Sequence, residues 1–445
     1  MRYFILLILA LTVLWGCNNL EDANLANRKT FVHFFDEAYN MSASAIEVIP
    51  GGYMILGNRT VELADTSYTQ TVLLEVDKNG KRIGDFHFYD GGTGKAFKYI
   101  DNGAFTGYVI VGDSIYTDPT AEQAANVTIA SMRILVINTD FIVLGKEYIA
   151  DKRPISPSNP VKTDFFSGSV NLTSNGVVFL GSYKEGVINQ QSAPEKQLLF
   201  AVDNNLDSAW FKTYDLLGNT YANTKSVHAN NGHILWATSV LDVQGDFTSS
   251  YVTIPYVVEG SEFENNNSIG LTTTQSFIAR DMQPSNSPAL GYGVIGTYSK
   301  ATDGSEGNMF FFRVLPNGNI IPGSDRYFDG IESFKSDSLD INKNFSTIVD
   351  EGEAICSTSD GGFVLAGSFT TNPEKGNGGK DILLIKVNFL GNIVWSKTFG
   401  AGGDETISAI REASDGSLLI CGTSDLGDYS SIFLMKTDSN GEIKN

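Results

Sequence analysis

The sequence predicts an all-β protein, a seven-bladed β-propeller of four-stranded blades, from three observations. An apolar run that ends in glycine, a loop, a second apolar run and an Asn-Gly-like turn recur in this order along the chain. In the clearest pair of repeats, residues 353–367 and 408–422, the final glycines lie 55 positions apart. An orphan apolar segment precedes the first repeat, and the last repeat stops where its fourth strand is expected to begin. Periods of this size, filled with short strands, are typical of radial or stacked β repeats.

Residues 1–17 are predicted to be a lipoprotein signal peptide outside the fold. The apolar run from Tyr3 to Leu14 is shorter than the roughly 20 residues that a membrane-spanning helix needs. Leu14-Trp15-Gly16-Cys17 resembles a lipobox, in which the cysteine receives diacylglycerol, although tryptophan is an unusual residue at its position. We therefore expect lipidation of Cys17, with ordinary secretion as the alternative.

Residues 18–29 are polar and are predicted to be a flexible tether between the anchor and the folded domain. Glu21 and Asp22 resemble the acidic export tags of surface-exposed lipoproteins. The expected location is the outer membrane, with the cell surface preferred over the periplasm.

Each repeat is predicted to contain four strands. A small residue ends the second apolar run of each one: Gly57, Gly112, Gly181, Ala237, Gly296, Gly367 and Gly422. Turns such as Pro50-Gly51-Gly52 and Ser414-Asp415-Gly416 suit tight hairpins between the first two strands. The third strand is rich in Leu, Ile, Val and Phe, as expected of a strand buried on both faces. The fourth repeat is the most degenerate, and its boundaries between Val257 and Ser276 stay open.

The two ends of residues 30–445 are expected to meet in one blade. Residues 30–35 resemble Phe86-His87-Phe88-Tyr89, the fourth strand of the first repeat. We expect this N-terminal strand to complete the last blade and close the ring, since closure removes unpaired sheet edges.

The last two repeats resemble bacterial lipoproteins and secreted proteins built from β-propeller repeats. The shared motifs are Ser-Asp-Gly-Gly, a later glycine, an Asp-x-x-Gly-Asn-type turn and Trp-Ser-Lys-Thr, and residues 353–400 and 405–445 carry them. The resemblance implies a fold far more than an activity.

Composition excludes one class of partner. The net charge of −20 repels phosphate backbones, so nucleic acid is not an expected partner. Cys356 and Cys421 fall in apolar stretches of neighbouring repeats, and we expect two buried thiols rather than a disulfide.

The connections predicted on one face, after the second and the fourth strands, are long and irregular. Such loops on a rigid scaffold commonly carry recognition. Their Ser, Thr, Asn and Asp residues suit a glycan or a protein partner, and solvated loops without a ligand are the alternative. The candidate ligand-binding residues are Tyr68, Tyr116, Tyr183, Tyr298 and Tyr429.

Several motifs resemble catalytic or nucleotide-binding signatures without their essential parts. Gly112-Asp113-Ser114-Ile115 resembles the nucleophile block of GDSL esterases, but no Asp-x-x-His pair follows it. Asp90 to Lys95 resembles part of a quinoprotein docking motif, yet it occurs once and is better interpreted as a polar turn. The four histidines are interpreted as structural surface residues.

A calcium site is the weakest candidate. Asp340, Asn342, Asn344 and Glu351 mimic the oxygen spacing of a calcium loop, but Phe345 stands where the sharp turn requires glycine. No metal and no cofactor are therefore expected.

The function predicted from sequence is non-catalytic: a membrane-anchored propeller that binds a glycan or an envelope protein through its long-loop face. The alternatives are a hydrolase or lyase that acts on polysaccharide in the central funnel, and a scaffold subunit of an envelope complex. No repeated Arg, Glu or Asp occurs at matching blade positions, which argues against the enzyme.

Overall fold

The computed structural model describes the folded part of the chain in segments. They are residues 30–35, 40–63, 67–117, 128–149, 161–187, 195–215, 219–244, 247–261, 263–269, 276–299, 307–328, 350–370, 379–400, 402–425 and 427–444. Cys17, the predicted signal peptide and the predicted tether lie outside these residues. In the described segments no helix is long and apolar enough to cross a membrane.

The described chain is all-β apart from one 3-10 turn, η1 (Pro288–Leu290), and its strands pair mainly in sequence order. The first sheet contains β2 (Asn40–Ile49), β3 (Gly52–Glu62), β4 (Ser67–Asp77) and β5 (Arg82–Asp90). The second contains β6 (Ala96–Asp101), β7 (Thr106–Thr117), β8 (Thr128–Asn138) and β9 (Val143–Ile149). The third contains β10 (Val161–Thr173), β11 (Gly176–Val187), β12 (Glu195–Asp203) and β13 (Ser208–Tyr214).

An eight-stranded sheet follows, made of two antiparallel halves joined by one parallel bridge between Ser250 and Ser276. Its first half contains β14 (Asn219–Asn230), β15 (His233–Gln244), β16 (Phe247–Val258) and β17 (Phe263–Ile269). Its second half contains β18 (Ser276–Pro284), β19 (Tyr292–Ser299), β20 (Gly307–Val314) and β21 (Arg326–Phe328).

Two further four-stranded sheets complete the fold. One contains β22 (Asp350–Ser357), β23 (Phe363–Thr370), β24 (Lys380–Val387) and β25 (Ile393–Phe399). The other contains β26 (Asp404–Glu412), β27 (Leu418–Asp425), β28 (Ser430–Thr437) and, paired antiparallel with β28, the N-terminal strand β1 (Phe31–Phe35).

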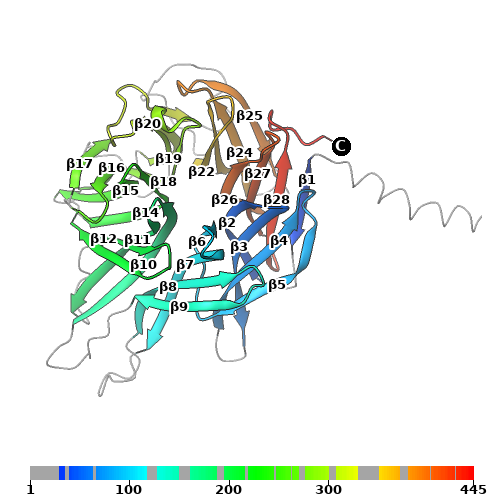
Figure 1. The fold of residues 1–445 in the computed structure, drawn as a ribbon. Helices are drawn as coiled ribbons and strands as arrows, with labels where there is room; N and C mark the ends of the chain where they lie inside the picture. The colour runs from blue at the N-terminus through cyan, green and yellow to red at the C-terminus, as the bar shows by residue number, and fades with distance from the viewer. Residues whose placement is uncertain are drawn as a thin grey trace, which may run out of the picture.

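The sheets surround a common centre with the first strand of each innermost (Figure 1), which is the architecture of a β-propeller. The first strands of successive sheets contact one another, and β26 contacts β2. The apolar core lies between neighbouring sheets, as the two-sided burial of β4, β20, β24 and β28 requires. Cys356 and Cys421 are buried in it and are not joined by a disulfide, as predicted.

The recurring glycine of the second strand has a steric cause. In most sheets the first strand carries a bulge opposite this glycine, for example between Gly352 and Ala354. The bulge brings a backbone carbonyl so close that a Cβ on Gly367 would lie 1.9 Å from the carbonyl oxygen of Glu351. The motif therefore indicates close backbone approach rather than a ligand.

The turn between the third and fourth strands has its own signature. An Asp or Asn side chain at its start accepts hydrogen bonds from the backbone N–H groups two and four residues later, as Asp77 does from Asn79 and Lys81. Asn138, Asp203, Asn388 and Asp438 repeat this arrangement. These side chains accept hydrogen bonds from the backbone N–H groups of the turn, where the hydrogen bonding between the third and fourth strands ends.

The strands reach further than the sequence suggests. Residues 59–70 were expected to form an irregular loop, but β3 and β4 pair through this region up to Glu62 and Ser67. Likewise β10 begins at Val161, inside another expected loop, and pairs with β11 throughout. Alternating polar residues on such hairpins resemble loop composition, which explains the error.

Candidate functional site

The structure distributes the predicted tyrosines over different environments. Tyr68 is exposed near the tip of the β3–β4 hairpin, whereas Tyr183 in β11 is half-buried and stacks on Phe165. Tyr429 is half-buried just before β28. Tyr116 lies in β7 opposite Ile129.

Tyr298 does not lie in an exposed loop. It is buried in β19, where its ring lies 4.7 Å from Phe277 and 5.0 Å from Tyr327, measured between centroids. The prediction of an exposed position failed because the strand continues past its landmark glycine, Gly296. The five tyrosines therefore do not form one platform.

Most of the calcium candidate lies outside the described residues, because Asp340, Asn342 and Asn344 fall in the undescribed segment 329–349. Glu351 is described, and its Oε2 atom lies 2.7 Å from Lys380 Nζ. Among the described parts of the chain, no group of three or more His, Cys, Asp or Glu side chains could hold a metal ion.

The turn from Asp90 to Lys95 has a structural role between the first two sheets. Arg133 is buried beneath it and donates hydrogen bonds to the carbonyl oxygens of Asp90, Gly92 and Thr93. Lys95 Nζ lies 2.5 Å from Asp113 Oδ2. These contacts agree with the interpretation of residues 90–95 as a polar turn. The Asp113 carboxylate also accepts hydrogen bonds from the backbone and hydroxyl of Ser167, so it links two sheets.

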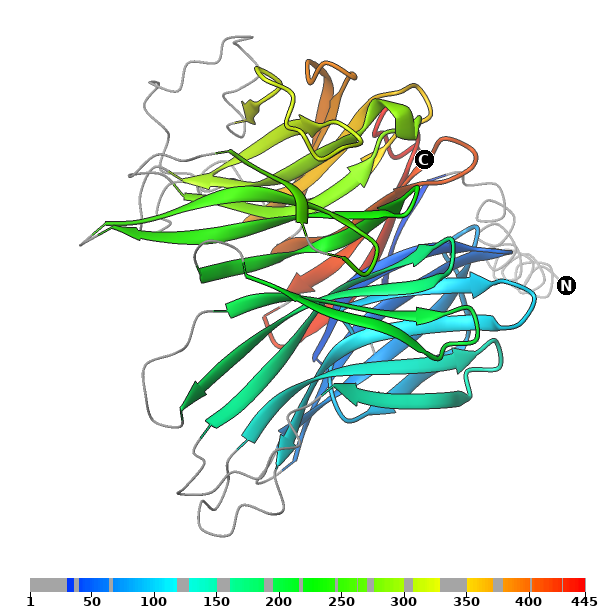
Figure 2. The same cartoon turned by 60° about the vertical axis from the view of Figure 1, so that its left-hand side comes forward.

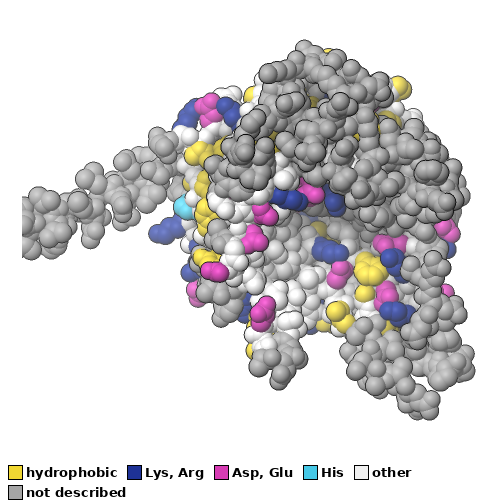
Figure 3. Space-filling view, turned by 180° about the vertical axis from the view of Figure 1, so that it is seen from behind, with side chains coloured by type: hydrophobic (Ala, Val, Ile, Leu, Met, Phe, Trp, Pro, Cys, Tyr) yellow, Lys and Arg dark blue, Asp and Glu magenta, His cyan; other side chains and the backbone are white. Residues whose placement is uncertain are grey.

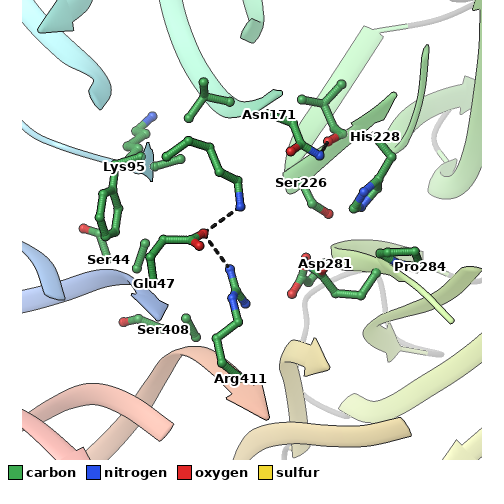
Figure 4. Close-up of a pocket in the computed structure, with 18 residues that line it drawn as sticks. Ser44, Glu47, Lys95, Asn171, Ser226, His228, Asp281, Pro284, Ser408 and Arg411 are labelled. Carbon is green, nitrogen blue, oxygen red and sulfur yellow. Dashed lines mark hydrogen bonds and ion pairs between the residues drawn. The ribbon is translucent and has the colours of Figure 1, made fainter. Parts of the chain in front are cut away.

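A cavity of about 240 Å³ lies at the centre of the molecule (Figure 4), lined by first strands and by the residue preceding β6. Its residues come from β2, β6, β10, β14, β18 and β26. It is the principal candidate site, because side chains from sheets far apart in sequence converge there. Seen from behind, acidic and basic side chains intersperse around a hollow in the surface (Figure 3).

One polar residue or cysteine of each first strand pairs with the second strand three positions before the landmark residue, or two positions before it in β15. We call these residues the central polar set: Glu47, Lys98, Asn171, His228, Gln283, Cys356 and Arg411. All except Cys356 line the cavity. Cys356 is packed in the core, where burial raises the pKa of its thiol to about 12.

Three members of the set form an ion cluster. Glu47 Oε1 lies 2.6 Å from Lys98 Nζ and 3.6 Å from Arg411 Nη2. Burial opposes ionisation of Glu47, but the two cations outweigh burial and lower the pKa of this carboxyl. Burial also disfavours the Arg411 charge, yet Glu47 and Asp281 raise the pKa of its guanidinium. Glu47 and Arg411 are therefore charged at neutral pH.

Ser226, His228 and Asp281 are the residue types of a hydrolase triad, but their side chains form hydrogen bonds with backbone groups. Ser226 Oγ and His228 Nε2 both bond to the carbonyl oxygen of Met282. The Asp281 carboxylate accepts hydrogen bonds from the backbone N–H groups of Met282 and Ile355. The three side chains therefore join β14, β18 and β22.

His228 is not the surface residue that the sequence suggests. It is buried, and burial lowers its pKa to about 4, so the ring is neutral at pH 7. Its Nε2–H group donates to a carbonyl, which fixes the tautomer. This ring is unsuited to accept a proton from a nucleophile at neutral pH.

A second candidate surface is the end where second and third strands connect. Second strands continue three residues past the landmark in β19, β23 and β27, to Ser299, Thr370 and Asp425. They continue five to seven residues in β3, β7, β11 and β15, to Glu62, Thr117, Val187 and Gln244. At about 3.3 Å per residue this adds roughly 7–13 Å of height. We call the extended ends of these four hairpins the raised rim (Figure 2).

Sequence reasoning anticipated the end of the molecule that carries the raised rim, because the predicted long-loop face includes the connections between second and third strands, but it missed the central polar set. The central polar set has no repeated residue type, so no motif identifies it. No Arg, Glu or Asp is repeated within the set, but three single charged residues, Glu47, Lys98 and Arg411, occupy equivalent register positions. Aligning the repeats on the strand before each first turn, and seeking any polar residue there, would have found the set.

Comparison with known proteins gives no family. No protein-family description matches the chain, and no curated protein matches it either. Among solved structures, the propeller domain of the Trilobed protease from Pyrococcus furiosus is 9% identical with a TM-score of 0.44, covering 93% of this chain and 99% of that one. Drosophila Plexin A in complex with Semaphorin 1b is 11% identical with a TM-score of 0.43, covering 92% and 87%. Superpositions this loose do not decide between functions.

Proposed function

We propose that the chain is a seven-bladed propeller closed by its N-terminal strand. The two halves of the eight-stranded sheet each have the blade pattern and share only one bridge, which favours counting them as two blades. Pairing of β1 with β28 and contact between β26 and β2 favour a closed ring. Thr30 Oγ1 also exchanges two 2.8 Å hydrogen bonds with the backbone of Lys444.

The propeller is anchored in the outer membrane through lipidated Cys17, with residues 18–29 as the tether and the surface-exposed side preferred. The signal-like segment and the lipobox resemblance support this part of the proposal. A tethered propeller can present one end to a partner while its anchor stays in the leaflet.

The function is non-catalytic binding of an envelope protein by the raised rim, and the observation that carries it is the asymmetry of the rim. The second strands of four consecutive blades extend further past their landmarks than those of the other three. The described ends of the first two of these hairpins expose apolar side chains. Ile115 is 75% exposed and Tyr68 is 43% exposed, and Leu63 is also exposed there. Apolar and aromatic side chains held on rigid strands suit a protein partner, and a glycan is the alternative.

A hydrolase or lyase in the central funnel is a second candidate. It gains support from the charged groups Glu47, Lys98 and Arg411 around the cavity. The hydrogen bonds of Ser226, His228 and Asp281 favour a structural role over catalysis at those residues. Polysaccharide cleavage that Glu47→Gln abolishes would establish the enzyme and displace the binding proposal.

The test is a pull-down from native envelopes with the full lipidated chain. A double variant, Tyr68→Ser with Ile115→Ser, removes the exposed apolar groups of the rim. Leu390→Ser is the matched control, because Leu390 is exposed on a turn at the opposite end. The proposal expects a partner that the wild type and the control recover and the rim variant loses.

Two results would overturn this assignment. Equal recovery by the rim variant would exclude the rim as the docking surface and favour a scaffold that binds through its side wall. Binding on a glycan array without a protein partner would replace the protein by a glycan. A Cys17→Ser chain reports separately on the anchor, since it should lose membrane association and keep the rim intact.

A further inference from the structure

The central cavity brings charged side chains of both signs together. The chain carries a net charge of −20. The cavity lining contains three cations, Lys95, Lys98 and Arg411, and two carboxylates, Glu47 and Asp281. His228 adds no charge at pH 7, because burial lowers its pKa to about 4. How strongly each cation is engaged by a carboxylate decides whether the cavity can take up an anionic group.

Two of these charges are matched locally. Lys95 is paired with Asp113, and its ammonium also reaches the carbonyl oxygen of Ser167 at 3.2 Å. Asp281 accepts hydrogen bonds from two backbone N–H groups and from the amide of Gln283. The carboxylate of Asp281 keeps its charge and, with Glu47, raises the pKa of Arg411. Lys98 and Arg411 therefore face two carboxylates, of which Glu47 lies within ion-pair distance of both.

The geometry of that cluster leaves the guanidinium weakly engaged. Lys98 makes a short contact with Glu47 Oε1, whereas Arg411 Nη2 lies 3.6 Å from the same oxygen, beyond hydrogen-bond distance. Arg411 Nη1 donates to the carbonyl oxygen of its neighbour Ile410. A guanidinium has five donors in a planar fork, which suits two-point recognition of a second carboxylate.

The polar neighbours of the cluster suit hydroxyl groups. Ser44 Oγ accepts a 2.9 Å hydrogen bond from Asn58, so its own proton can be donated into the cavity. Gln283 donates through its amide nitrogen to Asp281, and its amide oxygen is an acceptor. The cavity volume of about 240 Å³ lies below the range of about 300–1,000 Å³ typical of drug-sized ligands. A ligand of one sugar unit fits this size.

We propose that the central cavity binds a small polyhydroxylated carboxylate, of the size and chemistry of a sugar acid. Its carboxylate pairs with Arg411 and Lys98, and its hydroxyls meet Ser44 and Gln283. Glu47 competes with the ligand for the two cations and so limits the affinity. This site is separate from the raised rim and does not depend on the partner proposed there.

The experiment is calorimetry and thermal unfolding of the full-length chain in detergent, with D-galacturonate as the probe. D-Galactose is the matched neutral sugar, since it has a CH₂OH group in place of the carboxylate. Galacturonate should bind, and its affinity should fall with added salt. Galactose should bind at least about tenfold more weakly than galacturonate.

Two variants have opposite expected effects. Arg411→Gln should weaken galacturonate binding by about tenfold or more, whereas Arg82→Gln, exposed on the outer strand β5, should leave it unchanged. Glu47→Gln should lower the melting temperature, because Lys98 and Arg411 then repel each other, and should tighten galacturonate binding. Galacturonate should therefore raise the melting temperature of Glu47→Gln more than that of the wild type.

Any of three results would overturn the proposal: no heat and no stabilisation with millimolar galacturonate, equal binding of galactose, or weaker binding in Glu47→Gln. A purely structural ion cluster predicts destabilisation of Glu47→Gln without enhanced rescue by the probe. Loss of partner recovery by the rim variant has no bearing on these measurements, so the two proposals fail independently.

Discussion

At the scale of single residues, the aspartate of the Ser-Asp-Gly motif has a buried partner. Lys386 in β24 is only 4% exposed, and its ammonium bonds to Asp360 Oδ1 at 2.6 Å and to Thr358 Oγ1. In the next sheet Lys436 lies 3.2 Å from Asp415 Oδ2. The motif therefore holds a desolvated cation under the turn, which is a reason for its recurrence that has no link to ligand binding.

Removing the charge of this aspartate should destabilise the fold. Asp360→Asn leaves the buried Lys386 ammonium without its carboxylate, and we expect a loss of about 1–3 kcal/mol in the free energy of unfolding. Chemical denaturation measures it. Asp85→Asn, on the exposed face of β5, is the control and should change the free energy by less than about 0.5 kcal/mol. Equal effects of the two substitutions would contradict a role for the Lys386 pair.

The same pair predicts a pH dependence. Partial burial disfavours the charged form of Asp360, but hydrogen bonds from Lys386, Thr358 and the Gly362 N–H outweigh it and lower its pKa to about 2, from an ordinary value of 3.8. A depressed carboxyl pKa stabilises the folded state above the ordinary value, and this stabilisation is lost as pH falls through the depressed one. The stability difference between wild type and Asp360→Asn should thus be nearly complete above about pH 4, decrease as pH falls towards 2 and vanish only below it. Denaturation at stepwise pH values tests this, and a difference at pH 2 as large as that above pH 4 would refute it.

At the scale of elements, the raised rim should be dispensable for folding. Arg59 and Gln70 face each other across the β3–β4 hairpin and are hydrogen-bonded at 2.9 Å. Replacing residues 60–69 by Asn-Gly would join them through a two-residue turn that suits this register. The melting temperature should stay within a few degrees of the wild type, while recovery of the envelope partner should be lost.

A shortening elsewhere provides the comparison. The β27–β28 connection lies at the same end but rises only three residues beyond Gly422. Replacing residues 426–429 by Asn-Gly should leave both stability and partner recovery intact. If the shortened β3–β4 variant still recovered the partner, the height of the rim would not be what the partner recognises.

The sequence predicted elements better than it predicted surfaces. Turns such as Asn79-Gly80 and landmarks such as Gly367 depend on local sterics, so the residue types in the sequence are enough to predict them. The central polar set could not be predicted, because its members differ in type and only the pairing register makes them equivalent. Tyr298 was misplaced for a related reason, since how far a strand continues past its glycine depends on the partner strand.

At the scale of the whole molecule, β1 joins the beginning and the end of the fold. Phe31 and Phe35 are buried in a core cluster that includes Ile46 and Tyr53 of the first sheet and Leu434 of the last. A Cβ on Gly80, in a turn of the first sheet with φ +80°, would lie 2.2 Å from the Phe31 ring. The strand thus pairs with one sheet and packs against the next.

Deleting residues 30–35 while keeping residues 1–29 should therefore act on the whole propeller. The β28 edge loses its partner, and apolar surface between the last and first sheets becomes exposed to water. We expect a melting temperature lower by more than about 10 °C and dimers formed through the free edge, measured by calorimetry and light scattering. A synthetic peptide of residues 29–36 should restore the monomer.

Two point variants separate packing from pairing. Phe31→Ala, at a side chain that is 7% exposed, should lower the free energy of unfolding by about 3 kcal/mol. Phe34→Ala, at a side chain that is 47% exposed, should lower it much less. A deletion variant that stays monomeric with an unchanged melting temperature would show that β1 does not close the ring.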